Sequence, residues 1–380
     1  MKPVANGGTQ ITYVPNHIPQ LDGLRGVAIL LVISYHYFGY MILFSLGWCG
    51  VDLFFVLSGF LITGKLLDTI NDRHYFLNFF RNRILRIFPL YYLTLIVLFV
   101  AFLISGNENL PALSIYYDHW PSFFIFTQNW TFILFGLPGD KTLVHFWSLA
   151  VEEQFYLVWP FIIYFIKRDP LRIAFLLLLF PLIIALRIYI YSQYPSPADY
   201  PHYYFNTLCR MDSLAMGSLV CVVSRSTFKL NIKMTLGVIL LTSILIIIGI
   251  FQMGNAHPVN LFFGKYGYTL LAIFFAAFLI VSILSGNHFL NLMLTNSYLR
   301  FCGKISYGLY IFHWPVRLIL GVKMNHWIFA WTGNLQWAHL ISLLSSLVIT
   351  FLISALSFRY FEERFLRLKH RSVRKNILFS

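Results

Sequence analysis

Long apolar stretches, separated by short polar segments, run along almost all of this 380-residue chain. About 20 apolar residues suffice to cross a bilayer as a helix, because a helix rises about 1.5 Å per residue and the hydrocarbon layer is about 30 Å thick. Backbone groups in lipid must be hydrogen-bonded within the protein, which favours helices, whereas a membrane barrel would show short alternating segments. The pattern predicts an all-α, polytopic transmembrane helical bundle of about ten spans, at residues 22–44, 48–67, 88–104, 147–166, 171–191, 208–224, 234–252, 266–285, 305–321 and 338–358.

Composition supports one membrane domain. The chain is 58% hydrophobic and 11% charged, with a mean hydropathy of +0.71, which excludes a water-soluble domain. We expect a transmembrane domain over 1–366 and a basic cytoplasmic tail over 367–380, with the first span as the insertion signal. The longest outer connection, 105–146, holds an apolar aromatic run that could be a re-entrant or interfacial piece.

The positive charges follow the predicted topology. If both termini are cytoplasmic, 21 of the 28 Lys and Arg fall in cytoplasmic segments and three in outer loops. This is the positive-inside distribution, so the net charge of +14 indicates a membrane partner and no nucleic acid. The four cysteines show no metal-binding spacing, and no metal site is expected.

The first span carries Arg25 and His36, eleven residues apart and within roughly 20° on one helix face. Asp22 lies one turn from Arg25. Counted from residue 22, His36 lies about 21 Å into the layer, past its midplane. A neutral histidine there could simply pack against a neighbouring helix, but its polar company on other spans favours a functional role.

Four ionisable groups on other predicted spans fall at a similar depth. Asp52 and Glu152 lie at about 22 and 21 Å, and Arg210 and Asp212 at about 21 and 18 Å. Each would cost at least about 2.5 kcal/mol facing lipid, so we expect them to face inward. They form either a polar cluster that ties four helices together, or a general-base site in which a carboxylate orients His36.

We expect Asp212 and several further candidates to bind the donor or to line a substrate path. Arg83 and Arg86 are i, i+3 neighbours that could grip phosphates, or hold the topology and contact anionic lipid. His313 and Arg317 lie one turn apart on one face, and Pro315 between them would interrupt the helix and free a carbonyl. The small residues after Ser58 could let a thin ligand pass between spans, or serve helix packing.

Several motifs, taken in order, resemble the acyltransferase 3 family. The resemblance covers about residues 22 to 366 and rests on LDGLRGVAILLV with its downstream histidine, GVDLFFVLSGFLIT, RNRILRIFPLYY, HFWSLAVEEQFYLVWP, RMDSLAMG, GKISYGLYIFHWP and RYFEERF.

This resemblance implies a multi-pass enzyme of the bacterial inner (cytoplasmic) membrane. Such enzymes move an acyl group, usually acetyl, from cytoplasmic acyl-CoA to a hydroxyl of an extracytoplasmic glycan such as lipopolysaccharide O-antigen, peptidoglycan or exopolysaccharide. His36 matches the family's first-span histidine, Arg25 its arginine and Glu152 its WSLAVE glutamate, while Arg83 and Arg86 match the basic pair thought to meet CoA. The resemblance implies acetyl-CoA as donor substrate, a glycan or lipid-linked sugar as acceptor, and no permanently bound cofactor. Some members carry an extracytoplasmic esterase-like domain, which we do not expect in this chain.

The resulting hypothesis is an O-acyltransferase. Acyl-CoA docks on Arg83 and Arg86, its pantetheine arm threads the bundle, and His36, oriented by Glu152 or Asp52, takes a proton from the sugar hydroxyl.

Two questions stay open at this point. Arg210 or Arg25 would stabilise the oxyanion, and the transfer is either direct or passes through an acyl group on His36 or Ser58. The alternative function is a proton-coupled transporter or flippase of a glycan precursor, because histidines and carboxylates within membranes also build proton relays.

Overall fold

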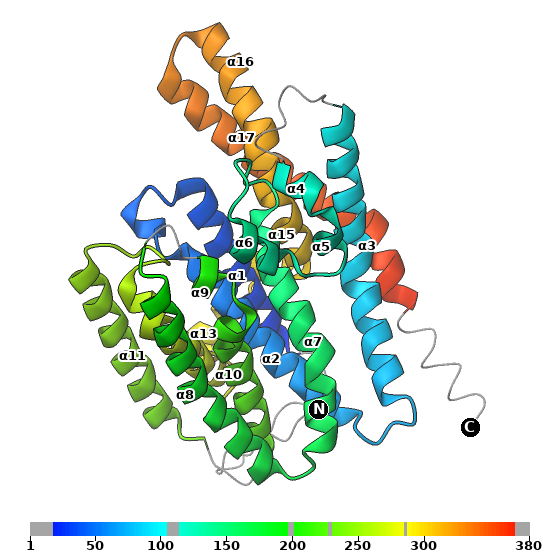
Figure 1. Ribbon diagram of the computed structural model, residues 1–380, viewed down its shortest axis with the longest axis vertical. Coiled ribbons are helices and arrows are strands. Elements are labelled where there is room, and N and C mark those ends of the chain that lie inside the picture. Colours follow the sequence, from blue (N-terminus) through cyan, green and yellow to red (C-terminus); the bar gives the residue numbers. More distant parts are fainter. Residues whose placement is uncertain (1–17, 105–113, 197–200, 227–229, 285–286, 369–380) are drawn as a thin grey trace. The chain divides into compact units, whose positions relative to one another are not determined.

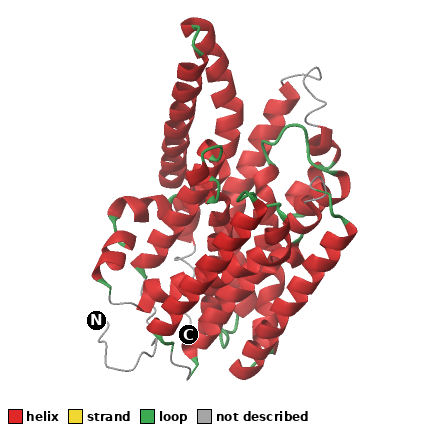
Figure 2. Ribbon diagram, turned by 90° about the vertical axis from the view of Figure 1, so that its left-hand side faces the viewer, coloured by secondary structure: helices red, strands yellow, loops and turns green. Residues whose placement is uncertain are grey.

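A computed structural model describes residues 18–104, 114–196, 201–226, 230–284 and 287–368. Within these ranges the chain is helical and contains no strand (Figure 2). The all-α prediction is therefore confirmed for the described part of the chain. The predicted basic tail lies outside the described residues from position 369 onward.

Most predicted spans are helices long and apolar enough to cross a membrane. The helices Ser297–Lys304 and Ser306–Thr332 add one candidate if they form a single span. A tenth predicted span is the 19-residue helix α7 (Trp147–Phe165), whose hydropathy is lowered by two glutamates and a glutamine. The chain is thus a multi-pass membrane protein, and which side its termini face stays a prediction. The other eight candidates are Pro19–Phe38, Ile42–Asp68, Tyr75–Ile104, Asp169–Gln193, His202–Arg225, Ile232–Met253, Phe263–Leu284 and Leu335–Leu368.

The chain divides into two compact units, each assembled from segments far apart in sequence. The first unit is drawn from 1–71 and 148–304, and the second from 72–147 and 305–380. The main helices of the first unit are α1 (Pro19–Phe38), α2 (Gly50–Asp68), α7, α8 (Asp169–Gln193), α10 (Thr207–Arg225), α11 (Ile232–Met253), α12 (Tyr268–Leu284), α13 (His288–Leu294) and α14 (Ser297–Lys304) (Figure 1). Those of the second are α3 (Tyr75–Ile104), α4 (Ser114–Asp118), α5 (Trp120–Phe124), α6 (Gln128–Phe135), α15 (Ser306–Pro315), α16 (Val322–Thr332) and α17 (Leu335–Ser357).

The first helix is shorter than predicted. Helix α1 ends at Phe38, whereas the apolar run extends to residue 44. Gly39 follows the helix, and two short 3₁₀ turns lead the chain to α2. Hydropathy missed this end because the residues after Gly39 are as apolar as those before it. His36 consequently lies in the last turn of α1 rather than about two turns before the end of a longer helix.

Helices α2 and α10 touch backbone to backbone. A Cβ added at Gly59 would overlap the carbonyl oxygen of Leu214, and one at Gly217 would overlap that of Val56. Just beyond, the Oγ1 of Thr63 donates to a serine Oγ on α10 at 2.9 Å. Small residues allow such close crossings in membranes, so the small residues following Ser58 serve helix packing.

We expect Gly217→Ala to destabilise the protein by about 1–3 kcal/mol, because the new methyl group has to force α10 away from α2. Gly237→Ala is the matched control, since a Cβ there meets nothing within 4 Å and alanine favours the α11 helix. Unfolding of the purified protein in mild detergent, followed by circular dichroism, measures the difference. Equal stability of the two variants would show that the α2–α10 crossing is looser than described.

The second unit has longer helices than predicted. Helix α3 starts at Tyr75 instead of residue 88, so the arginine-rich segment is part of it. Beyond Pro315 the chain continues as the π-helix Val316–Gly321 and then α16, because a wider turn accommodates the ring and the missing N–H. Pro315 therefore changes the helix type without ending the helix, which corrects the predicted interruption. Helices α16 and α17 run side by side (Figure 1).

The apolar run of the long outer connection contains two short helices, α5 and α6. Phe123 and Phe132 are fully buried in the second unit, and the Gln128 amide donates to the Phe146 carbonyl at 2.8 Å. Helices of five and eight residues are too short to cross the hydrocarbon layer.

Candidate functional site

His36 is held by the backbone of its own helix. Its Nδ1 lies 3.0 Å from the carbonyl oxygen of Val32. A carbonyl only accepts, so Nδ1 carries the proton and Nε2 is the basic nitrogen. A backbone carbonyl thus sets the tautomer, the task that the sequence hypothesis gave to Glu152 or Asp52.

His36 lies at a different level from the other predicted site residues of the first unit. Gly50, the first residue of α2, packs against Val32, and Gly47 packs nearer the end of α1, so the two helices run antiparallel. His36 is one turn beyond Val32, and Ser58 is two turns beyond Gly50 in the opposite direction. With a rise of 1.5 Å per residue, about 18 Å along the helix axes separates His36 from Ser58.

A buried ion pair occupies the level between them. Asp52 is fully buried and pairs with Arg210 at 2.9 Å. Ser213 donates to the same carboxylate at 3.0 Å, and the guanidinium of Arg210 lies 3.8 Å from the ring centroid of Tyr268. By the same axial count, Asp52 is about 9 Å from His36.

A second pair lies on the same helix, α10. Asp212 pairs with Arg187 of α8 at 2.9 Å, and both side chains are fully buried. Thr269 of α12 donates to Asp212 at 2.8 Å, and Arg187 also donates to Thr269 and, at 3.3 Å, to the carbonyl of Cys209. Arg187 was not predicted as a site residue, although an arginine within a span was a visible signal. Together the two neutral pairs join α2, α8, α10 and α12, which favours the structural interpretation of this cluster.

The third level holds Ser58, Glu152 and Tyr156. The Oγ of Ser58 donates to the Oε1 of Glu152 at 2.7 Å and lies 3.0 Å from the hydroxyl oxygen of Tyr156. Ser58 lies six residues along α2 from Asp52, about 9 Å further from His36. Eight residues along α2 from Gly50 correspond to eight residues back along the antiparallel α1 from Val32. The level of Ser58 therefore also contains the first turns of α1, where Arg25 is half-buried. The residues predicted to share one layer thus lie at three levels. The prediction counted the depth of each residue from the end of its predicted span, and the structure places several of these helix ends elsewhere.

This third level can do two kinds of chemistry. A serine hydroxyl that donates to a carboxylate is the arrangement of a nucleophile and its base. The same hydroxyl and carboxylate groups can also exchange hydrogen bonds with the amides of a ligand. The contact between Glu152 and Ser58 was not anticipated from sequence.

The basic pair belongs to the second unit. Arg83 and Arg86 are half-buried in the first half of α3, and the guanidinium of Arg83 lies 6.0 Å from the ring centroid of Phe79. Their i, i+3 spacing on a regular helix is as predicted, and their phosphate-binding role stays a prediction.

Two histidines meet in the second unit. His313 is fully buried, its Nδ1 donates to the Tyr310 carbonyl at 2.8 Å, and its ring centroid is 5.1 Å from that of His145. Tyr310 in turn donates its hydroxyl to the His145 carbonyl at 2.7 Å. Arg317 follows on the π-helix, half-buried. His145 was not among the predicted site residues, although it begins the same HFWSLAVEEQFYLVWP motif as Glu152. Among the described residues, no three His, Cys, Asp or Glu side chains are placed to hold a metal ion.

Comparisons with known proteins place these features in context. Residues 18–359 match a family described as an acyltransferase domain. YrhL of Bacillus subtilis, provisionally named as a peptidoglycan O-acetyltransferase, is 30% identical over 367 residues, covering 91% of this chain and 54% of YrhL. The peptidoglycan O-acetyltransferase OatA of Listeria monocytogenes is 29% identical over 377 residues, covering 92% of this chain and 56% of OatA.

A Staphylococcus aureus protein, provisionally named as an O-acetyltransferase, is 30% identical over 317 residues, covering 79% of this chain and 50% of that protein. The chain spans about half the length of these relatives. No solved structure matches it.

Proposed function

Because the chain belongs to the acyltransferase 3 family, we propose that it is a multi-pass membrane O-acetyltransferase. The family match over 18–359 carries this proposal, and the relatives named as O-acetyltransferases support it. The positive-inside distribution supports a location in the cytoplasmic membrane with Arg83 and Arg86 near the cytoplasm.

The proposed acceptor is a sugar hydroxyl of a cell-envelope glycan. The names of YrhL and OatA favour peptidoglycan over the lipopolysaccharide O-antigen expected at first from the family resemblance. The proposed donor is acetyl-CoA, whose phosphates would meet Arg83 and Arg86 through forked, charge-assisted hydrogen bonds.

The proposed reaction is a direct transfer at His36. Nε2 takes the proton of the sugar hydroxyl, and the oxygen attacks the thioester carbonyl. The C–S bond breaks, the thiolate of CoA leaves with the proton from the imidazolium, and the acetyl ester remains on the sugar.

Glu152 and Ser58 take a different role in this proposal. At about 18 Å from His36 along the helix axes they are too far away to orient its ring. Their role in this proposal is instead to bind the amides of the pantetheine arm.

We expect Ser58→Ala to raise the KM for acetyl-CoA about two- to tenfold with little change in kcat, because the variant loses one hydrogen bond worth about 0.5–1.5 kcal/mol. Steady-state release of CoA by the purified protein measures both constants. A collapse of kcat at an unchanged KM would instead identify Ser58 as an acylated nucleophile, against direct transfer.

The function itself is tested by mass spectrometry of the envelope glycans from cells with and without the gene. The expected result is a loss of one acetyl unit per modified sugar, restored by the wild-type gene. Purified protein in liposomes, given acetyl-CoA and a glycan acceptor, should release free CoA in step with acetylation. Movement of the glycan across the membrane without CoA release would overturn the proposal in favour of a transporter.

A further inference from the structure

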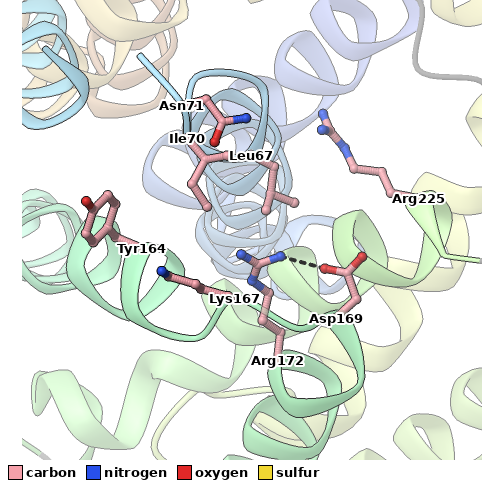
Figure 3. Close-up of a pocket in the computed structure, with 8 residues that line it drawn as sticks. All are labelled: Leu67, Ile70, Asn71, Tyr164, Lys167, Asp169, Arg172 and Arg225. Carbon is pink, nitrogen blue, oxygen red and sulfur yellow. Dashed lines mark hydrogen bonds and ion pairs between the residues drawn. The ribbon is translucent and has the colours of Figure 1, made fainter. Parts of the chain in front are cut away.

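The first unit has a cavity of about 440 Å³ apart from the three levels around His36, Asp52 and Ser58 (Figure 3). It lies where α2, α7 and α10 end and α8 begins. Its lining comprises Leu67, Ile70, Asn71, Tyr164, Lys167, Asp169, Arg172 and Arg225. Segments around all four helix ends belong to the part of the chain that the charge distribution assigns to the cytoplasm.

A buried arginine forms part of the wall. Arg172 is 6% exposed, and its Nη1 is 2.6 Å from the Asp169 carboxylate, as the dashed line in Figure 3 marks. Its Nη2 donates to the Ile163 carbonyl at 3.1 Å. Its Nε is buried and has no hydrogen-bond partner among the described residues. The guanidinium is therefore held by two hydrogen bonds, and its Nε–H is among the donors left for a further acceptor.

Two further cations, Arg225 and Lys167, line the cavity and give it an excess of positive charge. Arg225 pairs with Asp68 at 2.9 Å and also donates to the Gly64 carbonyl at 3.1 Å. Lys167 is exposed at the rim and has no ion-pair partner among the described residues. Three cations thus face two carboxylates, and the surplus charge is on Lys167, the most exposed of the three side chains.

These features suit an oxyanion. The volume is in the range of about 300–1,000 Å³ that small-molecule sites occupy. Arginine forks and lysine are the usual protein ligands of phosphate, and the 25-residue helix α8 starts at this cavity with its positive dipole end.

We propose that this cavity binds a phosphate-bearing ligand, either a soluble nucleotide phosphate or the headgroup of an anionic phospholipid. The proposal does not depend on acyl transfer. It assigns a ligand site to the α7–α8 turn, distinct from the basic pair on α3.

Binding to the purified full-length protein tests this. One arm measures the affinity for adenosine 3′,5′-bisphosphate in detergent without lipid. The other measures, by native mass spectrometry, how much phosphatidylglycerol the protein retains from mixed phosphatidylcholine nanodiscs. Both arms compare Lys167→Ala and Arg172→Gln with Arg168→Ala, a matched control that removes an exposed neighbouring cation outside the cavity.

We expect Lys167→Ala to weaken binding at least about fivefold and Arg172→Gln about tenfold, while Arg168→Ala changes it less than about twofold. An effect in the first arm identifies a nucleotide ligand, and an effect in the second identifies a lipid headgroup. If Lys167→Ala and Arg168→Ala behave alike in both arms, the proposal is wrong. Lys167 is exposed, so its variant decides the question even if Arg172→Gln fails to fold.

Discussion

His36→Ala should abolish acetyl transfer while leaving the protein folded. A positioned general base contributes about 10²–10⁴-fold to a rate. The alanine variant lacks the imidazole, and so has no Nε2 to take the proton of the acceptor hydroxyl. The ring lies in the last turn of α1 and is half-buried, so its loss removes few packing contacts. The measurement is acceptor-dependent release of CoA by the purified variant, with CoA release in water as the baseline.

His288→Ala is the matched control, because His288 belongs to the same unit and is exposed on α13. It should retain wild-type activity. A His36→Ala enzyme with more than about a tenth of the wild-type rate is incompatible with a general base at this position. Acetyl-CoA binding by the inactive variant, measured by equilibrium dialysis, separates lost chemistry from lost donor affinity.

Arg210→Ala should destabilise the first unit by about 3–5 kcal/mol, because it leaves the fully buried carboxylate of Asp52 without its counter-charge. Asp52→Ala should cost a similar amount by stranding the guanidinium over the ring of Tyr268. Unfolding in detergent followed by tryptophan fluorescence gives both values.

The double variant Asp52→Leu/Arg210→Met tells a scaffold from a catalytic pair. Replacing a buried pair by apolar side chains of similar volume is often neutral or stabilising, so we expect the double variant to regain most of the lost stability. A scaffold then also regains activity. A stable but inactive double variant would show that Asp52 and Arg210 take part in the reaction, as the sequence hypothesis predicted.

Much of the fold could be predicted because the bilayer imposes a simple rule on sequence. Runs of about 20 apolar residues had to be helices, and the helices lie where those runs are. Helix ends were harder. Hydropathy reports which residues tolerate lipid, not where a helix stops, so α1 was predicted six residues too long and α3 thirteen residues too short at its start.

The same errors in helix ends affected the prediction of which site residues lie together. Depths counted from predicted ends placed Asp52 and Glu152 beside His36, and errors of a few residues at each end are enough to merge levels about 9 Å apart. The partner of a buried charge is also invisible in one sequence. Arg187 and Asp212 pair although they lie 25 positions apart, and no local spacing rule relates them.

The interlock of Gly59 with α10 limits how this unit can move. If α2 slid along α10 by even a fraction of a turn, backbone carbonyl oxygens of one helix would collide with backbone atoms of the other. We therefore expect α2 and α10 to move together as one rigid pair. Any conformational change within this unit must therefore come from its other helices, while α2 and α10 keep their positions relative to each other.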